Sequence, residues 1–232
     1  MIDEQASLLL RAAGPIAGGA LFWLLYFDLK DSLRPEPRRV LFLGLLLGAL
    51  AVVPAWLLYR AMPMIGLPSG PEGTPRELTL FCLGVVGPIE EGVKFTLAAL
   101  VLFRLRWFDE PVDGLVYAST VGIGFAAAEN FVYAPSLEWY EQLARAFTSP
   151  LIHSLFSAVW GIGAAYAILS NWTLRQRVVV IAVSLSASMI LHGFYDAALL
   201  TLQAPWLASL IALLIWVFVL LHARTLLRAR QA

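Results

Sequence analysis

Runs of about 20 predominantly apolar residues recur along the whole chain, and they constrain its fold more than any other feature. A helix needs about that many residues to cross the hydrocarbon core of a bilayer. Of the 232 residues, 60% are hydrophobic and only 14% are charged, whereas soluble domains are about 45–50% apolar and about 25% charged. The sequence therefore predicts an all-α, polytopic membrane helix bundle whose surroundings are the lipid bilayer.

Seven transmembrane helices are expected, at about 7–27, 40–59, 77–103, 114–133, 150–169, 178–201 and 204–222. No soluble domain fits between them, so residues 1–232 are interpreted as a single integral-membrane domain. Its functional core is expected at about 77–200, with peripheral spans at 7–59 and 204–222. The third span should kink at Pro88, because proline removes a backbone hydrogen bond.

The connecting segments predict the orientation of the chain. With the N-terminus outside, eleven of the sixteen Lys and Arg residues lie on the cytoplasmic side and four on the other. The positive-inside rule therefore favours an extracytoplasmic N-terminus and a cytoplasmic C-terminus in the cell membrane. Residues 136–149 place Leu137, Tyr140 and Phe147 on one face, which is typical of an interfacial helix. Asp113 is interpreted as a helix cap.

Composition also excludes some classes of function. The net charge is zero and there is no basic block, so no nucleic-acid partner is expected. Cys82 is the single cysteine, which rules out an intrachain disulfide and a cysteine-based metal or redox motif.

Polar side chains inside four successive predicted spans are the main functional signal. A charged group at bilayer depth costs at least about 2.5–3.5 kcal/mol on insertion scales and by default marks a functional site. The polar residues within these spans are Glu90, Glu91, Lys94, Glu129, Asn130, His153, His192 and Asp196.

These residues also agree in depth. Glu129, His153 and Asp196 lie about three to five residues from span ends that reach the same membrane face, hence within roughly 4–8 Å of one interface. His192 is one helical turn deeper and Glu90 deeper again. The sequence therefore predicts one polar site, entered from the extracytoplasmic face.

Spacing along each helix suggests how the groups interact. Lys94 is three residues after Glu91 and four after Glu90, so its ammonium can neutralise either carboxylate. His192 and Asp196 are four apart and share a face, so Asp196 is expected to orient the imidazole.

Peptide hydrolysis is one chemistry that suits this cluster, because it needs an activated water, a proton donor and oxyanion stabilisation. Glu90 or Glu91 can act as the base. Glu129, His153 and His192 form a two-histidine, one-carboxylate set suited to a catalytic zinc. In a metal-free version, a glutamate activates the water while histidine and Asn130 stabilise the oxyanion. The residues alone leave both versions open.

A proton-coupled membrane transporter is the alternative, since buried Glu, His and Asp also form proton relays. The polar groups cluster near one interface, however, and the helices show no convincing inverted repeat. The sequence therefore favours an intramembrane protease.

The motifs that carry these residues resemble those of the PrsW family of intramembrane proteases. Glu90-Glu91-Gly92-Val93-Lys94 is similar to the family's Glu-Glu-x-x-Lys signature. Phe125-Ala126-Ala127-Ala128-Glu129-Asn130 is similar to its Phe-x-x-x-Glu-Asn motif, and His153 and His192 match two later motifs in order. Residues 34–39 and 113–117 also resemble the family, and the similarity covers about residues 26–200.

The resemblance implies a bacterial multi-pass protease, grouped with metalloproteases and distantly related to CAAX prenyl proteases. It implies membrane-anchored substrates, with anti-sigma factors cleaved outside the cytoplasm as the family's examples, and zinc as the candidate cofactor. The expected catalytic residues are Glu90, Glu91, Glu129, His153 and His192, and the expected supporting residues are Lys94, Asn130 and Asp196.

Overall fold

The computed structural model describes residues 2–30, 35–68, 70 and 73–229, and nearly all of them are helical. The α-helices are α1 (Ile2–Lys30), α2 (Arg38–Ala61), α3 (Pro75–Phe81), α4 (Gly87–Leu100), α5 (Pro111–Tyr133), α6 (Trp139–Leu169), α7 (Leu174–Leu200) and α8 (Pro205–Ala229). Shorter turns lie at η1 (Met62–Ile65), η2 (Cys82–Val86), η3 (Leu102–Arg104) and η4 (Ala134–Ser136). The expected all-α, polytopic architecture is confirmed.

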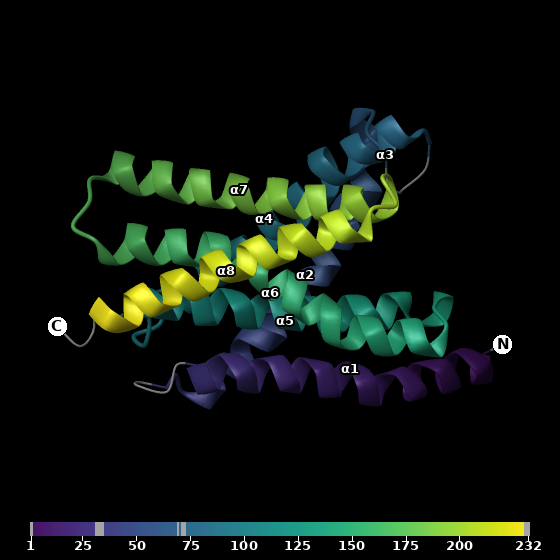
Figure 1. Cartoon of the computed structure of the whole chain (residues 1–232), viewed down its shortest axis with the longest axis horizontal. Helices are drawn as coiled ribbons and strands as arrows, with labels where there is room; N and C mark the ends of the chain where they lie inside the picture. The colour runs from purple at the N-terminus through teal and green to yellow at the C-terminus, as the bar shows by residue number, and fades with distance from the viewer. Residues whose placement is uncertain (1, 31–34, 69, 71–72, 230–232) are drawn as a thin grey trace.

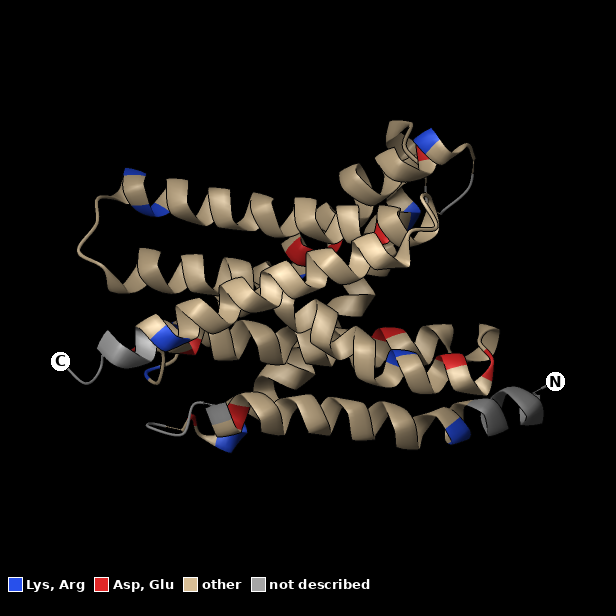
Figure 2. Cartoon of the chain, viewed as in Figure 1, with Lys and Arg blue, Asp and Glu red and all other residues tan. Residues whose placement is uncertain are grey.

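Six helices within the described residues are long and apolar enough to cross a membrane. Their spans are Leu9–Leu29, Arg38–Ile65, Pro111–Ser136, Trp139–Leu169, Leu174–Leu200 and Pro205–Thr225. Between α2 and α5 lie α3, η2 and α4, which cover most of the span expected at 77–103. Figure 1 places the two termini at opposite ends of the bundle. Figure 2 shows charged residues gathered at the helix ends, with a few carboxylates in the interior.

The third span is not among those six because Glu90, Glu91 and Lys94 make it too rich in charged residues, and its helix is also interrupted. The break takes the form of a π-helix at η2, in which the Gly87 amide bonds the Cys82 carbonyl five residues back. Pro88 directly follows and has no amide hydrogen of its own. Where the sequence predicts a kink at Pro88, the structure has a π-helix in the turn before the proline.

The amphipathic segment at 136–149 is not a separate interfacial helix. Its residues from Trp139 onward form the first turns of α6, which continues through Pro150 to Leu169. Tyr140 and Phe147 are exposed on its surface. Asp113 does cap a helix, as expected, because its Oδ2 accepts the backbone amides of Asp109 and Glu110.

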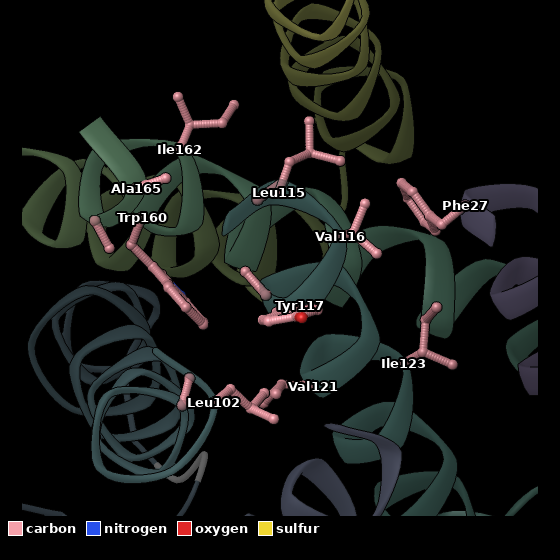
Figure 3. Close-up of a cluster of buried hydrophobic side chains, with 14 of the residues drawn as sticks. Phe27, Leu102, Leu115, Val116, Tyr117, Val121, Ile123, Trp160, Ile162 and Ala165 are labelled. Atoms are coloured by element: carbon pink, nitrogen blue, oxygen red, sulfur yellow. The ribbon is translucent and has the colours of Figure 1, made fainter. Parts of the chain in front are cut away.

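The centre of the bundle is the pair α5 and α6. In their most apolar stretches 72% and 78% of residues are buried, against 17–33% in the other candidate spans. Figure 3 shows Tyr117 and Val121 of α5 in one buried cluster with Trp160 of α6 and Leu102 of η3. Two glycines make this contact close, because a Cβ on either Gly114 or Gly161 would overlap the backbone of the other. Small residues let membrane helices approach in this way.

Two residues in the motifs that the resemblance rests on, Glu36 and Tyr117, are hydrogen-bonded to each other near the start of α5. Tyr117 donates a hydrogen bond from its hydroxyl to Glu36, which precedes α2. Arg34, of the same motif, and Arg230, counted in the charge bias, lie outside the described residues.

Candidate active site

Glycines at three helix contacts bring the polar residues of four helices together. A Cβ on Gly87 of α4 would overlap the Met189 carbonyl of α7, and one on Gly193 would overlap the Cys82 carbonyl in η2. A Cβ on Gly122 of α5 would overlap the His153 carbonyl of α6. The backbones that carry Glu90, Glu91, His153 and His192 are therefore within direct contact of a neighbouring helix.

Glu91 is the most enclosed group of the site, with no exposed surface. Its Oε1 accepts hydrogen bonds from Lys94 Nζ at 2.8 Å and His192 Nδ1 at 2.9 Å. Its Oε2 accepts from Trp160 Nε1 at 2.9 Å and from the hydroxyls of Ser157 and Ser188 at 3.3 Å each. A buried carboxylate needs such compensation, and here both oxygens are saturated.

The contacts of the two histidines define their tautomers. A carboxylate only accepts, so Nδ1 of His192 carries the hydrogen that faces Glu91, and in the neutral ring Nε2 keeps its lone pair. An ammonium only donates, so Nδ1 of His153 accepts from Lys94 Nζ at 2.8 Å. Nε2 of His153 then carries the hydrogen that faces Glu129 Oε2, 3.3 Å away.

Lys94 is the buried counter-charge of the cluster. Its ammonium lies 2.8 Å from Glu91 Oε1 and 3.4 Å from Glu90 Oε2, and neither its side chain nor that of Glu91 is exposed. It also lies 4.0 Å from the centroid of the Phe125 ring, a cation–π contact. Both pairings expected from the spacing are therefore present.

Glu90 faces the two imidazoles. Its Oε2 lies 3.8 Å from His153 Nδ1 and 3.8 Å from His192 Nε2, while its Oε1 accepts a 2.9 Å hydrogen bond from the hydroxyl of Tyr59. Glu90, His153 and His192 form the one group within the described residues whose donor atoms lie within 4.8 Å of one another and could hold a metal ion.

Glu129, expected as the third metal ligand, lies outside that group. Its Oε2 contacts His153 and also accepts a 3.0 Å hydrogen bond from Arg145 Nη2. Asn130 exchanges hydrogen bonds with Arg145, accepting from its Nε and donating to its carbonyl at 3.2 Å each. Asn130 is thus bonded to Arg145 near the start of α6. Arg145 in turn binds Glu129, which contacts His153.

Asp196 lies on the exposed side of the cluster. Its Oδ2 is 3.5 Å from Nε2 of His192, the nitrogen that also faces Glu90. The ring nitrogen that Asp196 was expected to hold is instead bonded to Glu91. Exposure of the acidic side chains rises from 0% at Glu91 through 6% at Glu90 and 16% at Glu129 to 23% at Asp196. Asp196 and Glu129 are thus the most exposed carboxylates of the cluster.

Five further side chains bind the predicted residues, and sequence reasoning missed them. They are Tyr59, Arg145, Ser157, Trp160 and Ser188. Helical spacing could have pointed to two of them, because Ser157 is four residues after His153 and Ser188 four before His192. Tyr59 and Arg145 come from segments with no such signal.

Comparison with known proteins identifies relatives over most of the chain. Residues 36–223 match the model of a family described as "PrsW family intramembrane metalloprotease". Protease PrsW of Geobacillus kaustophilus is 31% identical over 191 residues, which cover 82% of this chain and 80% of the relative. Protease PrsW of Bacillus subtilis is 28% identical, with 89% of each chain covered. That of Clostridioides difficile is 29% identical, over 93% of this chain and 87% of the relative. No solved structure matches the chain.

Proposed function

The chain belongs to the PrsW family of intramembrane metalloproteases, and we propose that the cluster around Glu90, His153 and His192 is its peptidase active site. An intramembrane protease acts on membrane proteins. We propose that the substrates of this chain are membrane-anchored proteins cleaved near the extracytoplasmic face, with single-span anti-sigma factors as the first class to test. The family assignment favours peptidase chemistry over the alternative of proton-coupled transport.

The observation that carries the proposal is the pairing of each histidine with a carboxylate that is not part of the donor set. Glu91 holds Nδ1 of His192 and Glu129 holds Nε2 of His153. The two remaining nitrogens both face Glu90 Oε2 at 3.8 Å. Metal-binding histidines commonly donate their other N–H to a carboxylate, which fixes the ring and strengthens the ligand.

This donor set suits zinc, which accepts two imidazole nitrogens and a carboxylate oxygen and leaves a position open in catalytic sites. Glu90, His153 and His192 would hold the ion, in place of the set with Glu129 that the sequence suggested. Lys94 Nζ touches the same nitrogen of His153, so metal binding requires the ammonium to turn toward Glu91, which it already contacts. A bound zinc would polarise the peptide carbonyl and lower the pKa of a bound water.

The remaining carboxylates have distinct parts in the proposed reaction. Glu91 is a poor proton acceptor for the attacking water, because both its oxygens already accept hydrogen bonds from protein donors. Asp196 is the most exposed of these carboxylates, and its Oδ2 lies 3.5 Å from His192 Nε2. A water bound next to the donor set would therefore lie close to Asp196. In the metal-free version, Glu90 is the carboxylate that faces the imidazoles and can accept the proton.

Metal dependence tests the proposal most directly. We expect the full-length protein, purified in detergent, to contain zinc and to cleave a single-span anti-sigma factor of its host tagged at both ends. Chelation should stop cleavage and zinc should restore it, because the ion supplies the activated water. His153→Ala and His192→Ala should abolish both metal retention and cleavage while the protein still inserts into the membrane.

Two outcomes would contradict parts of the proposal. Full cleavage by metal-free protein, with loss of activity in Glu90→Gln, would support the glutamate-water mechanism at the same site. Full cleavage by the double variant that carries both His192→Ala and Glu90→Gln would overturn the assignment of the site itself.

A further inference from the structure

A tyrosine from α2 supplies a polar contact to the buried cluster. The hydroxyl of Tyr59 donates a 2.9 Å hydrogen bond to Glu90 Oε1, across 31 residues of sequence. Its ring lies half-buried with its centroid 6.4 Å from that of Phe81. Tyr59 belongs to none of the motifs that carry the family resemblance, and its span was expected to be peripheral.

This hydrogen bond divides the two oxygens of Glu90 between different partners. Oε1 is held by the neutral phenol, while Oε2 lies 3.8 Å from each of the two candidate imidazole nitrogens. Lys94 Nζ is 3.4 Å from Oε2, which is longer than its 2.8 Å contact with Glu91. Tyr59 and Lys94 therefore hold the Glu90 carboxylate from opposite sides.

Loss of the phenol would leave Lys94 as the remaining partner within hydrogen-bond distance of Glu90 in the described part of the chain. A bond between two charged groups is stronger than one to a neutral donor. The carboxylate would then be free to rotate onto the ammonium and turn its oxygens away from the histidines.

We propose that Tyr59 is a positioning residue, whose hydroxyl holds the Glu90 carboxylate with Oε2 facing His153 and His192. The proposal rests on the proposed function of that donor set. Tyr59 acts through Glu90, so its contribution is to the geometry of the donors.

Replacing Tyr59 by phenylalanine removes one oxygen atom and keeps the ring against Phe81. We expect Tyr59→Phe to bind cobalt(II), measured by competition with a coloured chelator on the full-length protein in detergent, about 10-fold more weakly than the wild type. Partners of metal ligands typically change affinity by about 10–100-fold. In cleavage of the tagged substrate, kcat should fall while KM stays the same.

Tyr140→Phe is the matched control, because Tyr140 is exposed at the start of α6. It should leave both metal affinity and kcat unchanged. A Tyr59→Phe variant with unchanged metal affinity and unchanged kcat would overturn the proposal, and so would a rise in KM alone.

Glu90→Gln separates failure of this inference from failure of the proposed site. If Glu90→Gln weakens cobalt binding and Tyr59→Phe does not, the role of Tyr59 is wrong and the site stands. If Glu90→Gln has no effect on cobalt binding, the proposed donor set is wrong. In the Glu90→Gln background, Tyr59→Phe should cause no further loss of metal affinity or kcat, since the hydroxyl acts through that carboxylate.

Discussion

Glu90 and Glu91 are neighbours in one motif and both contact Lys94 and His192, yet their other surroundings differ. Successive residues of a helix point about 100° apart, so Glu91 faces Trp160 and Ser188 in the packed interior, while Glu90 faces Tyr59 and the imidazoles. The first is surrounded by donors that hold it in place. The second has an oxygen directed at the proposed reaction centre.

Glu91→Gln is expected to lower the stability of the fold. A glutamine amide has one NH₂ group, and at either position of the Glu91 carboxylate it would face a group that can only donate, Lys94 at one and Trp160 at the other. Leaving a buried group unsatisfied costs about 1–3 kcal/mol, and more where charges are involved. The thermal unfolding midpoint in detergent should therefore fall by several degrees.

Glu141→Gln is the control for that change. Glu141 is exposed, and its Oε2 accepts a single hydrogen bond from the Glu138 amide, which a glutamine oxygen can also accept. Its unfolding midpoint should match that of the wild type. An unchanged midpoint in Glu91→Gln would show that the interior tolerates an amide there.

At the scale of elements, the site depends on how closely helices approach. Gly122 of α5 lies against the His153 carbonyl, and Gly87 and Gly193 lie at the contact of η2 and α4 with α7. The π-helix at η2 directly precedes α4, which carries the two glutamates. Such turns are frequent at functional sites, and this one faces Gly193, the residue after His192.

Gly122→Ala should reduce both activity and stability, because the added methyl would push α6 outward at His153. Cleavage rate and unfolding midpoint should fall together. Gly18→Ala is the control, since a Cβ there meets no other atom within 4 Å. Alanine is the better helix former by about 1 kcal/mol, so Gly18→Ala should be neutral or slightly stabilising. Wild-type behaviour of Gly122→Ala would contradict the close packing.

For the whole molecule, the charge bias predicts an orientation that cysteine labelling can measure. Met64 lies in η1 after α2, and Asn171 lies between α6 and α7; both are exposed. In intact cells, a membrane-impermeant thiol reagent should label Met64→Cys, and Asn171→Cys only after permeabilisation. The native Cys82 is buried and should give little background. Labelling in the reverse pattern would invert the proposed topology and move the site opening to the cytoplasmic face.

The helical class, six of the seven expected spans and the clustering of the polar residues could be predicted because they depend on local properties. Hydropathy along a segment determines whether it can span a bilayer, and the rise per residue places Glu129, His153 and Asp196 at similar depth. The sequence motifs also indicated the protein family. The helix limits were less predictable, since α6 continues through Pro150 and the third span contains a π-helix.

Tertiary packing decided which groups touch. The rotation of each helix about its axis, and the glycine contacts between helices, bring Glu90 rather than Glu129 into the three-residue donor group. The same packing pairs Glu91 with His192, Arg145 with Glu129 and Tyr59 with Glu90. Spacing within one helix carries no information on such contacts, because they join atoms of helices far apart in the sequence.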